Sequence, residues 1–240
     1  MPERDCSDPY FDFAQIPFSA KADSALNELY KLRYEVYCIE CAFLDMARYE
    51  NEKESDEYDD CSAHFAAYTR DQTLVGTVRL VQPPEGMAYP FMEHCELYNH
   101  IVLPDRAEAA EISRLVVKKS YRRRRGDSLQ GISEEFLAGD AAPASALATG
   151  QIERATNSPR LLLGLYKQMY RYSCANGIRY WYAAMERSLA RALERMGFKF
   201  EPIGPQVDYY GKVAPYVVDL YELRERVRKD NAAVMNWLNK

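Results

Sequence analysis

The sequence lacks any hydrophobic run long enough to cross a membrane. None of its apolar stretches approaches the roughly 18 residues that a membrane-spanning helix requires. The start, Met-Pro-Glu-Arg-Asp-Cys, is charged and is not followed by the apolar region of a signal peptide. We therefore expect a soluble, cytoplasmic protein without a membrane span.

A surplus of positive charge is also missing. The 31 Lys and Arg residues are outnumbered by 36 Asp and Glu residues, which gives a formal net charge of −5. Basic residues are densest at 118–125, and few aromatic residues are interleaved with them. This composition argues against nucleic acid as a partner and indicates that the basic run acts on a local anion.

Cysteine is too scarce for a disulfide framework. Six cysteines in 240 residues of an expected cytoplasmic protein are typical of free thiols. Cys38-x-x-Cys41 and Cys61-x-x-His64 together have the ligand types of a structural zinc site. Small thiols on the apolar face of a helix explain them equally well. We predict no metal site, with zinc as the alternative that a metal assay would test.

The hydrophobic pattern switches repeatedly between the periods of helices and strands. Helix-like spacing predicts helices at residues 25–41, 127–137, 161–176, 188–196 and 223–238. β-rich runs predict strands at residues 11–18, 63–69, 74–81, 111–117, 178–185, 198–203 and 215–221, with residues 70–73 as a hairpin turn. This order indicates an α/β (α+β) fold, in which one domain over residues 1–240 has a mixed sheet with helices on both faces.

Two segments depart from these periods. Residues 49–60 are dominated by acidic side chains, which predicts a solvated, mobile loop. Residues 139–159 are rich in Ala, Ser, Thr, Gly and Pro without a period, which predicts a flexible insertion.

Two charged residues, Glu111 and Arg114, interrupt the apolar run at 111–117. In a regular strand they would point to opposite faces, so at least one charge would face inward. A buried charge is costly unless it is paired or used. Directly afterwards, the basic run ends at Gly126. A strand with an inward carboxylate, followed by a cationic turn, suits an enzyme that holds a phosphate-bearing donor beside a general base.

These motifs resemble those of the GNAT acyltransferases, whose fold is a three-layer αβα sandwich with a mixed, mostly antiparallel central sheet. A helix followed by Met-Gly197-Phe198 and a strand is a familiar feature of that fold. The sharper resemblance is to its acyl-homoserine-lactone (autoinducer) synthase branch. The positions that carry it, in order, are Arg33, Tyr37, Phe43, Asp56, Asp59, Arg79, Glu111 and Arg114.

The second half of the chain resembles two related groups. Tyr166 and the Gly204-Pro205…Tyr210-Gly211 pattern are similar to the N-acyl amino acid synthases and to the acyltransferases associated with the exosortase/PEP-CTERM export system. Two departures stand out. Tyr37 and Phe43 occupy positions where the autoinducer synthases have Phe and Trp. Leu193 occupies the position, four residues before the Gly-Phe pair, where many GNAT enzymes have a tyrosine general acid.

The resemblance implies an N-acyltransferase. It would move a long-chain acyl group from acyl carrier protein, or from acyl-CoA, to the amine of an amino acid or similar small acceptor. One alternative is an acyl-homoserine-lactone synthase that uses S-adenosylmethionine. The other is a non-catalytic regulator that binds acyl carrier protein. No cofactor would be bound permanently, because the acyl-phosphopantetheine or acyl-CoA is a co-substrate.

The resemblance also suggests roles for the site residues. Glu111 would be the general base, although a salt bridge that anchors the sheet is the competing interpretation. Arg114 would join Arg33 and Arg79 in a charge network with Asp56 and Asp59 that shapes the acceptor site.

Other residues would bind the acyl chain and the donor. Tyr37, Phe43 and Tyr166 would contact the substrates, although an apolar residue on a helix, such as Tyr166, is more often ordinary core. The donor-binding residues would be Val116, Val117, Lys118, Arg122, Arg123, Arg124, Arg125 and Gly126. The single glycine in this turn favours carrier-bound phosphopantetheine over coenzyme A.

Overall fold

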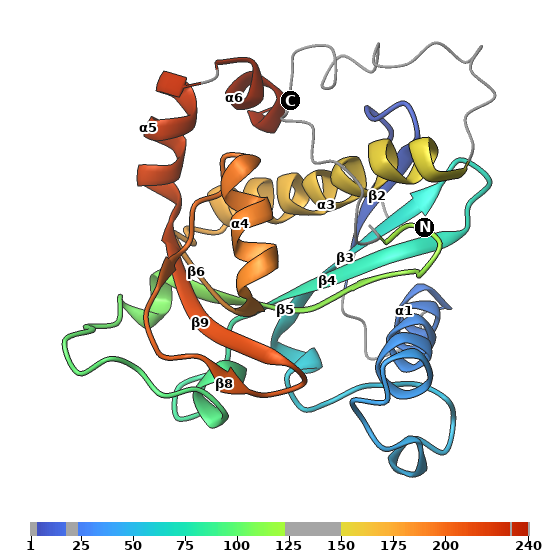
Figure 1. Cartoon of the computed structure of the whole chain (residues 1–240), viewed down its shortest axis with the longest axis horizontal. Coiled ribbons are helices and arrows are strands. Elements are labelled where there is room, and N and C mark those ends of the chain that lie inside the picture. The colour runs from blue at the N-terminus through green and yellow to red at the C-terminus, as the bar shows by residue number, and fades with distance from the viewer. Residues whose placement is uncertain (1–3, 18–23, 123–149, 231, 240) are drawn as a thin grey trace.

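The computed structural model describes the backbone of residues 4–17, 24–122, 150–230 and 232–239 (Figure 1). One mixed sheet runs through it, with strands in the order β1-β2-β3-β4-β5-β6-β9-β7 and β8 paired to β9. All neighbouring strands are antiparallel except β5 and β6. The strands are β1 (Arg4–Asp5), β2 (Phe11–Ile16), β3 (Ser62–Thr69), β4 (Leu74–Val81), β5 (Ala109–Val117), β6 (Tyr180–Glu186), β7 (Glu201–Pro202), β8 (Val207–Asp208) and β9 (Lys212–Asp219).

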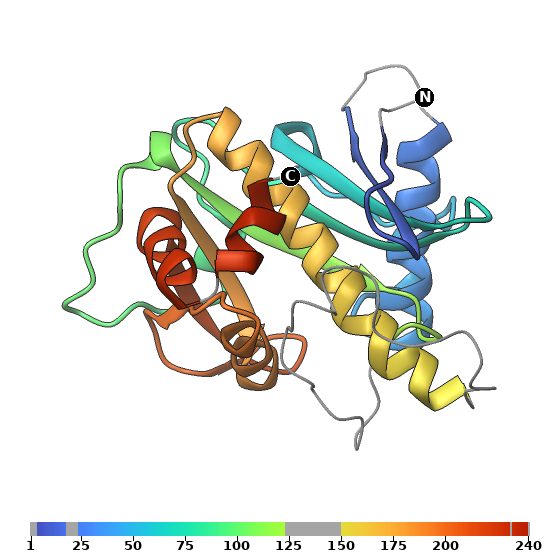
Figure 2. The same cartoon turned by 90° about the horizontal axis from the view of Figure 1, so that it is seen from above.

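Helices cover both faces of this sheet (Figures 1 and 2). The α-helices are α1 (Ser24–Tyr34), α3 (Gly150–Ala175), α4 (Arg187–Arg195), α5 (Leu220–Asp230) and α6 (Ala232–Asn239). A π-helical segment, Glu35–Glu40, continues α1, and single 3-10 turns lie at Met46–Arg48, Asp59–Cys61, Pro90–Glu93 and Arg106–Glu108.

The two faces of the sheet bury separate sets of side chains, as the strand period requires. Phe65 and Ala67 of β3 pack with α3 in the main core, whereas Ala66 and Tyr68 pack with α1 in a second cluster. The three-layer αβα sandwich with a mixed, mostly antiparallel sheet, expected from the sequence, is therefore confirmed.

Most expected elements are present, with three corrections. Gly150–Pro159 belongs to α3, so the flexible insertion predicted at 139–159 is wrong for its second half, and its first half lies outside the described residues. The strand expected at 198–203 shortens to β7, and the closing helix expected at 223–238 is divided into α5 and α6. The helix expected at 127–137 also lies outside the described residues.

The sheet opens between β5 and β6. Their parallel pairing extends from Ala109 opposite Tyr180 to Ile112 opposite Ala183, after which β5 continues to Val117 with only β4 beside it. The edge of β5 that faces β6 beyond Ile112 is therefore left without a strand partner. An unpaired edge of this kind offers backbone N–H and C=O groups to a ligand.

A β-bulge lies at the same point on the other edge of β5. Ser113 pairs with Arg79 and Val116 with Thr77, so two residues of β5, Arg114 and Leu115, stand opposite one residue of β4. Arg114 has φ 52°, a left-handed conformation that is rare for a residue with a side chain. A bulge bends its strand and re-aims its side chains, and this one lies where β5 turns away from β6.

Candidate active site

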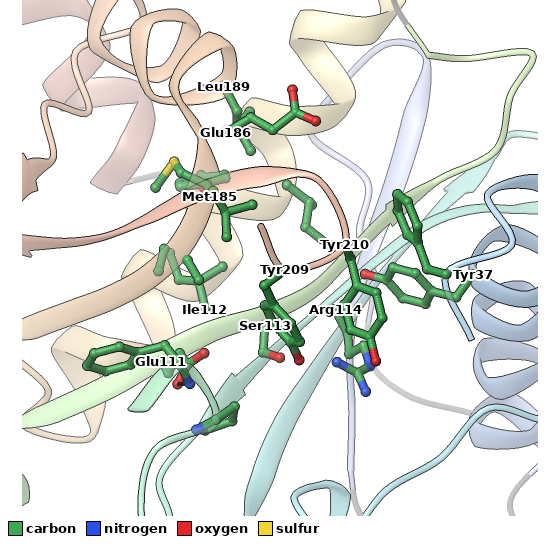
Figure 3. Close-up of a pocket in the computed structure, with 18 residues that line it drawn as sticks. Tyr37, Glu111, Ile112, Ser113, Arg114, Met185, Glu186, Leu189, Tyr209 and Tyr210 are labelled. Carbon is green, nitrogen blue, oxygen red and sulfur yellow. Dashed lines mark hydrogen bonds between the residues drawn. The ribbon is translucent and has the colours of Figure 1, made fainter. Parts of the chain in front are cut away.

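A cavity of about 260 Å³ occupies the opening between β5 and β6 (Figure 3). Its walls include Glu111 and Arg114 of β5, Met185 of β6, and Leu189 of α4. The turn between β8 and β9 adds Tyr209 and Tyr210, and the segment after the π-helix adds Phe43. The cavity thus combines carboxylate, guanidinium and aromatic groups with an apolar lining.

Glu111 is buried at the edge of this cavity. It is 3% exposed, and the backbone N–H of Phe91 donates to its Oε2 at 3.0 Å. Burial raises the pKa of Glu111 to about 8, although the Phe91 hydrogen bond and the charges of Arg79 and Arg114 oppose the rise. A carboxyl group with this pKa exchanges its proton near neutral pH, as a general base must. Glu111 makes no salt bridge among the described residues, so the anchoring interpretation gains no support from them.

The bulge brings Arg114 to the same cavity as Glu111. The sequence predicted opposite faces for the two side chains, and this prediction is wrong because the extra residue at the bulge breaks the alternation after Ser113. Arg114 donates from Nε to Glu54 at 3.1 Å and from Nη2 to Asp56 at 2.8 Å.

Two further arginines complete a buried network with the same carboxylates. Arg33, which is fully buried, donates to Glu54 and, at 2.6 Å, to Asp59. Arg79 donates to Asp59 at 2.7 Å and makes a two-armed contact with Asp56. The predicted network of Arg33, Arg79 and Arg114 with Asp56 and Asp59 is therefore assembled in the structure.

The network is balanced in charge, with three guanidinium groups and three carboxylates. Burial alone would raise the pKa of Asp59, but the guanidinium groups of Arg33 and Arg79 hold it well below its usual range. Burial would also raise the pKa of Asp56, but its hydrogen bond and ion pair with Arg79 lower it. All three carboxylates are paired with guanidinium groups, whereas Glu111 on the cavity wall has a raised pKa.

Glu54 is the member of this network that the sequence analysis missed. It is fully buried, as Asp59 nearly is, so the solvated loop predicted at 49–60 is wrong for these side chains. A signal was present, since Glu54 lies two residues before Asp56 in the acidic segment. Composition could not separate it from its exposed neighbours.

Aromatic rings form another wall. The ring of Tyr37 lies 5.4 Å from the Arg114 guanidinium and 6.4 Å from the ring of Phe43. Phe43 in turn contacts Tyr210 at 5.6 Å, and Tyr210 contacts Tyr209 at 4.4 Å. Tyr37 and Phe43 were predicted site residues, whereas Tyr209 and Tyr210 were not, although Tyr210-Gly211 belonged to the pattern that resembles the N-acyl amino acid synthases.

The remaining predicted residues are distributed as follows. Tyr166 of α3 lines the cavity. Val116 is buried against α1, and Val117 and Lys118 follow it at the end of β5. Arg122 pairs with Glu40. Arg123, Arg124, Arg125 and Gly126 lie outside the described residues.

The alternative zinc site gains no support from the geometry. Within the described part of the chain, no group of three or more Cys, His, Asp or Glu residues is arranged to hold a metal ion. His64 instead is fully buried beside the ionic network, with Nε2 3.3 Å from the backbone oxygen of Asp59. Its burial lowers its pKa to about 4.

Comparisons with known proteins agree with this fold. Residues 32–130, less than half of the chain, match the acetyltransferase (GNAT) domain family. No significant match exists among curated protein sequences. In the described residues, no helix is both long and apolar enough to span a membrane.

Three solved structures have a similar fold. TofI, in a ternary complex with an inhibitor and MTA, has a TM-score of 0.60 at 15% identity over 95% of this chain and 96% of its own. The AHL synthase LasI has a TM-score of 0.57 at 16% identity, covering 92% and 91%. The CoA-dependent acyl-homoserine lactone synthase BjaI, with SAM and isopentyl-CoA, has a TM-score of 0.57 at 18% identity, covering 91% and 93%.

At these identities the matches show the fold alone, and the fold is the GNAT-like α/β sandwich of the AHL synthases. None of these matches concerns exosortase or PEP-CTERM export, so that part of the expected resemblance remains without support.

Proposed function

We propose that this protein is an N-acyltransferase that moves an acyl group from a thioester donor to the amine of an amino acid or a similar small acceptor. The observation that carries the proposal is Glu111, a buried carboxyl group with a pKa of about 8 on the wall of a cavity between two diverging strands. An ammonium group is not a nucleophile, so the reaction needs a base whose pKa lies near the working pH.

The open edge of β5 is the place proposed for the donor. Beyond Ile112 its backbone groups face the cavity rather than a strand, so the amides of a phosphopantetheine arm would pair with them as an added strand does. The thioester carbonyl would then lie between Glu111 and the apolar residues Leu189 and Met185. An apolar surrounding excludes water and strengthens the electrostatic contacts made there.

The acceptor would lie against Arg114 and the aromatic wall. Arg114 uses Nε and Nη2 for Glu54 and Asp56, and its Nη1 has no hydrogen-bond partner among the described residues. A carboxylate of an amino-acid acceptor would pair with Nη1. The carboxylates behind Arg114 hold its guanidinium in place for that contact.

Acyl carrier protein remains the proposed donor, with acyl-CoA as the second choice. The basic segment that begins at Lys118 follows the open edge of β5 directly. Its positive charge would attract the acidic surface of a carrier protein and increase the association rate.

The alternative function is acyl-homoserine-lactone synthesis from S-adenosylmethionine. The fold shared with LasI and BjaI favours it, as does the ordered match of Arg33, Arg79, Glu111 and Arg114 to that branch. The synthases of that branch have Phe and Trp at the positions of Tyr37 and Phe43, and this difference argues against recognition of S-adenosylmethionine. A non-catalytic regulator that binds acyl carrier protein is the third candidate.

One experiment separates the three. The purified protein would be incubated with acyl carrier protein or CoA thioesters of several chain lengths and a panel of amino acids, with S-adenosylmethionine in a parallel reaction. Mass spectrometry of an N-acyl amino acid supports the proposal, and release of methylthioadenosine supports the alternative. Carrier binding without any product from any donor would refute both enzyme assignments.

A further inference from the structure

Under the proposed function, on which the inference about Tyr166 depends, the reaction releases a thiolate that has to gain a proton. Many GNAT enzymes have a tyrosine for this step where this chain has Leu193. That leucine is fully buried in α4 and has no proton to give. Another group on the cavity wall is therefore required.

Tyr166 of α3 has the properties of such a group. It lines the cavity and is 1% exposed, and its ring packs edge-on against Trp181 at 6.0 Å and Phe198 at 5.2 Å. Its hydroxyl has no hydrogen-bond partner among the described residues, and burial is the sole influence on its pKa, which it raises. The described part of the protein leaves this hydroxyl without a partner, so a ligand bound in the cavity would supply the contact.

The position of Tyr166 relative to Glu111 also fits. Tyr166 belongs to the core between the sheet and α3, on the same side as Ile112. Glu111, the preceding residue of β5, accepts a hydrogen bond from the backbone N–H of Phe91, which packs with Tyr89 and Tyr182 in a third cluster on the opposite face of the sheet. The cavity therefore connects the two faces through the opening in the sheet, with a base on one side and a hydroxyl on the other.

Two other tyrosines of the wall already have close neighbours. Tyr209 stacks on His94, with ring centroids 3.8 Å apart, and Tyr37 lies beside Arg114. Tyr166 is the tyrosine that lines the cavity from α3.

We propose that Tyr166 is a further catalytic residue, which protonates the sulfur as the thioester bond breaks. The amine nitrogen attacks the thioester carbonyl carbon and forms the new C–N bond, and Glu111 takes the proton that the nitrogen loses. The C–S bond then breaks, its electron pair goes to sulfur, and the phenol proton of Tyr166 goes to sulfur as well. Proton return from Glu111 to the phenolate through water restores both residues.

The test compares two donors that differ only in their leaving group. An alkyl thiolate, from a hexanoyl N-acetylcysteamine thioester, needs a proton to leave, whereas the thiophenolate of the matching S-phenyl ester leaves without one. For Tyr166→Phe we expect kcat to fall by ~10²–10⁴-fold on the alkyl donor and by no more than a small factor on the aryl donor. Thiol release with the amine that the wild-type protein accepts is the measurement.

Tyr170→Phe is the matched control. Tyr170 lies one turn further along α3 and is similarly buried, but it does not line the cavity. We expect it to retain wild-type rates on both donors. Because the Tyr166 hydroxyl has no partner to lose, Tyr166→Phe should also melt no lower than the wild type.

Each other outcome is decisive. Equal losses on both donors would mean that Tyr166 only shapes the cavity, and no loss on either donor would mean that it takes no part. A leaving-group effect found in Tyr209→Phe instead would move the acid to the other face. Each of these overturns the inference alone, whereas a wild-type protein that consumes neither thioester with any amine overturns the proposed function together with it.

Discussion

At the scale of a single residue, the burial of Glu111 determines its pKa. Its carboxyl group lies among apolar and aromatic side chains, and the nearest guanidinium groups, of Arg79 and Arg114, are already paired with Asp56, Asp59 and Glu54. Because those charges are balanced elsewhere, they oppose the desolvation of Glu111 only in part, and its pKa stays raised. In the proposed mechanism, the ionic network would keep its own carboxylates from competing with Glu111 for the proton.

Replacement of Glu111 by Gln tests its role as a base. The proposed mechanism requires the ionised form, so the wild-type rate should rise with pH and level off above about 8. Glu111→Gln should lower kcat by ~10²–10⁴-fold and remove this rise. The check is a pH–rate profile, with exposed Glu108→Gln, just before the start of β5, as the control. A variant that keeps the wild-type profile would show that the base is elsewhere.

The pH dependence of the free energy of unfolding should also reveal the raised pKa of Glu111. The folded-state pKa of Glu111 lies above its ordinary value of 4.5, so the folded protein binds the proton more tightly than the unfolded chain. The resulting stabilisation is complete below about pH 4.5 and is lost as pH rises toward 8. Urea denaturation of the wild type should therefore show a decline over this range that Glu111→Gln lacks. Parallel stability curves for the two proteins would contradict the raised pKa.

At the scale of elements, the contact between α3 and the sheet determines where Tyr166 lies. Gly164, two residues earlier, allows α3 to approach β2 so closely that an added Cβ would lie 1.9 Å from the ring of Phe13. Phe13 is itself buried, so the ring has little room to move. The close packing that Gly164 allows between α3 and β2 therefore explains a glycine in the middle of a helix, despite its low helix propensity.

Replacement of Gly164 by Ala tests this contact. Helix propensity alone predicts a gain of about 0.5–1 kcal/mol, but overpacking costs about 1–3 kcal/mol. We expect a net loss of stability and a lower kcat, since α3 carries Tyr166 away from the cavity. In a double-mutant cycle with Phe13→Leu, the smaller side chain should recover part of the loss. An increase in stability for Gly164→Ala alone would show that the approach is looser than described.

At the scale of the whole molecule, the cavity lies between two halves of one sheet. Four paired positions, from Ala109 with Tyr180 to Ile112 with Ala183, join the strands on either side. The acidic segment at 49–60 crosses to β4 and β5, where Asp59 binds Arg79 and Asp56 binds Arg114. The site therefore depends on parts of the chain that are far apart in sequence.

Replacement of Asp59 by Asn tests how much the ionic network stabilises the fold. Loss of this carboxylate leaves Arg33 and Arg79 buried with too few partners, which typically costs about 3–5 kcal/mol. Asp60→Asn, one residue away but exposed, should change stability little. Because the folded-state pKa of Asp59 is depressed, its contribution is present above about pH 4 and is lost as pH falls below it. Chemical denaturation at about pH 7 and about pH 3 measures both effects, and equal losses in the two variants would contradict the network.

The sequence by itself determined the local part of this protein. Side-chain periodicity identified the β3–β4 hairpin, β5 and most helices, because these patterns depend on residues a few positions apart. The ordered motif of arginines and acids identified Glu111, Arg114 and the members of the network through resemblance.

Only the tertiary structure decided how these residues meet. The bulge at Arg114 depends on the pairing of β5 with β4, and it reverses the face that simple alternation assigns to that side chain. The burial of Glu54 depends on Arg33 and Arg114, and the place of Tyr209 in the wall depends on the β8–β9 turn. The physical reason is the same in each case: charge pairing and strand register are contacts between distant segments, and no local pattern records which partner a side chain will find.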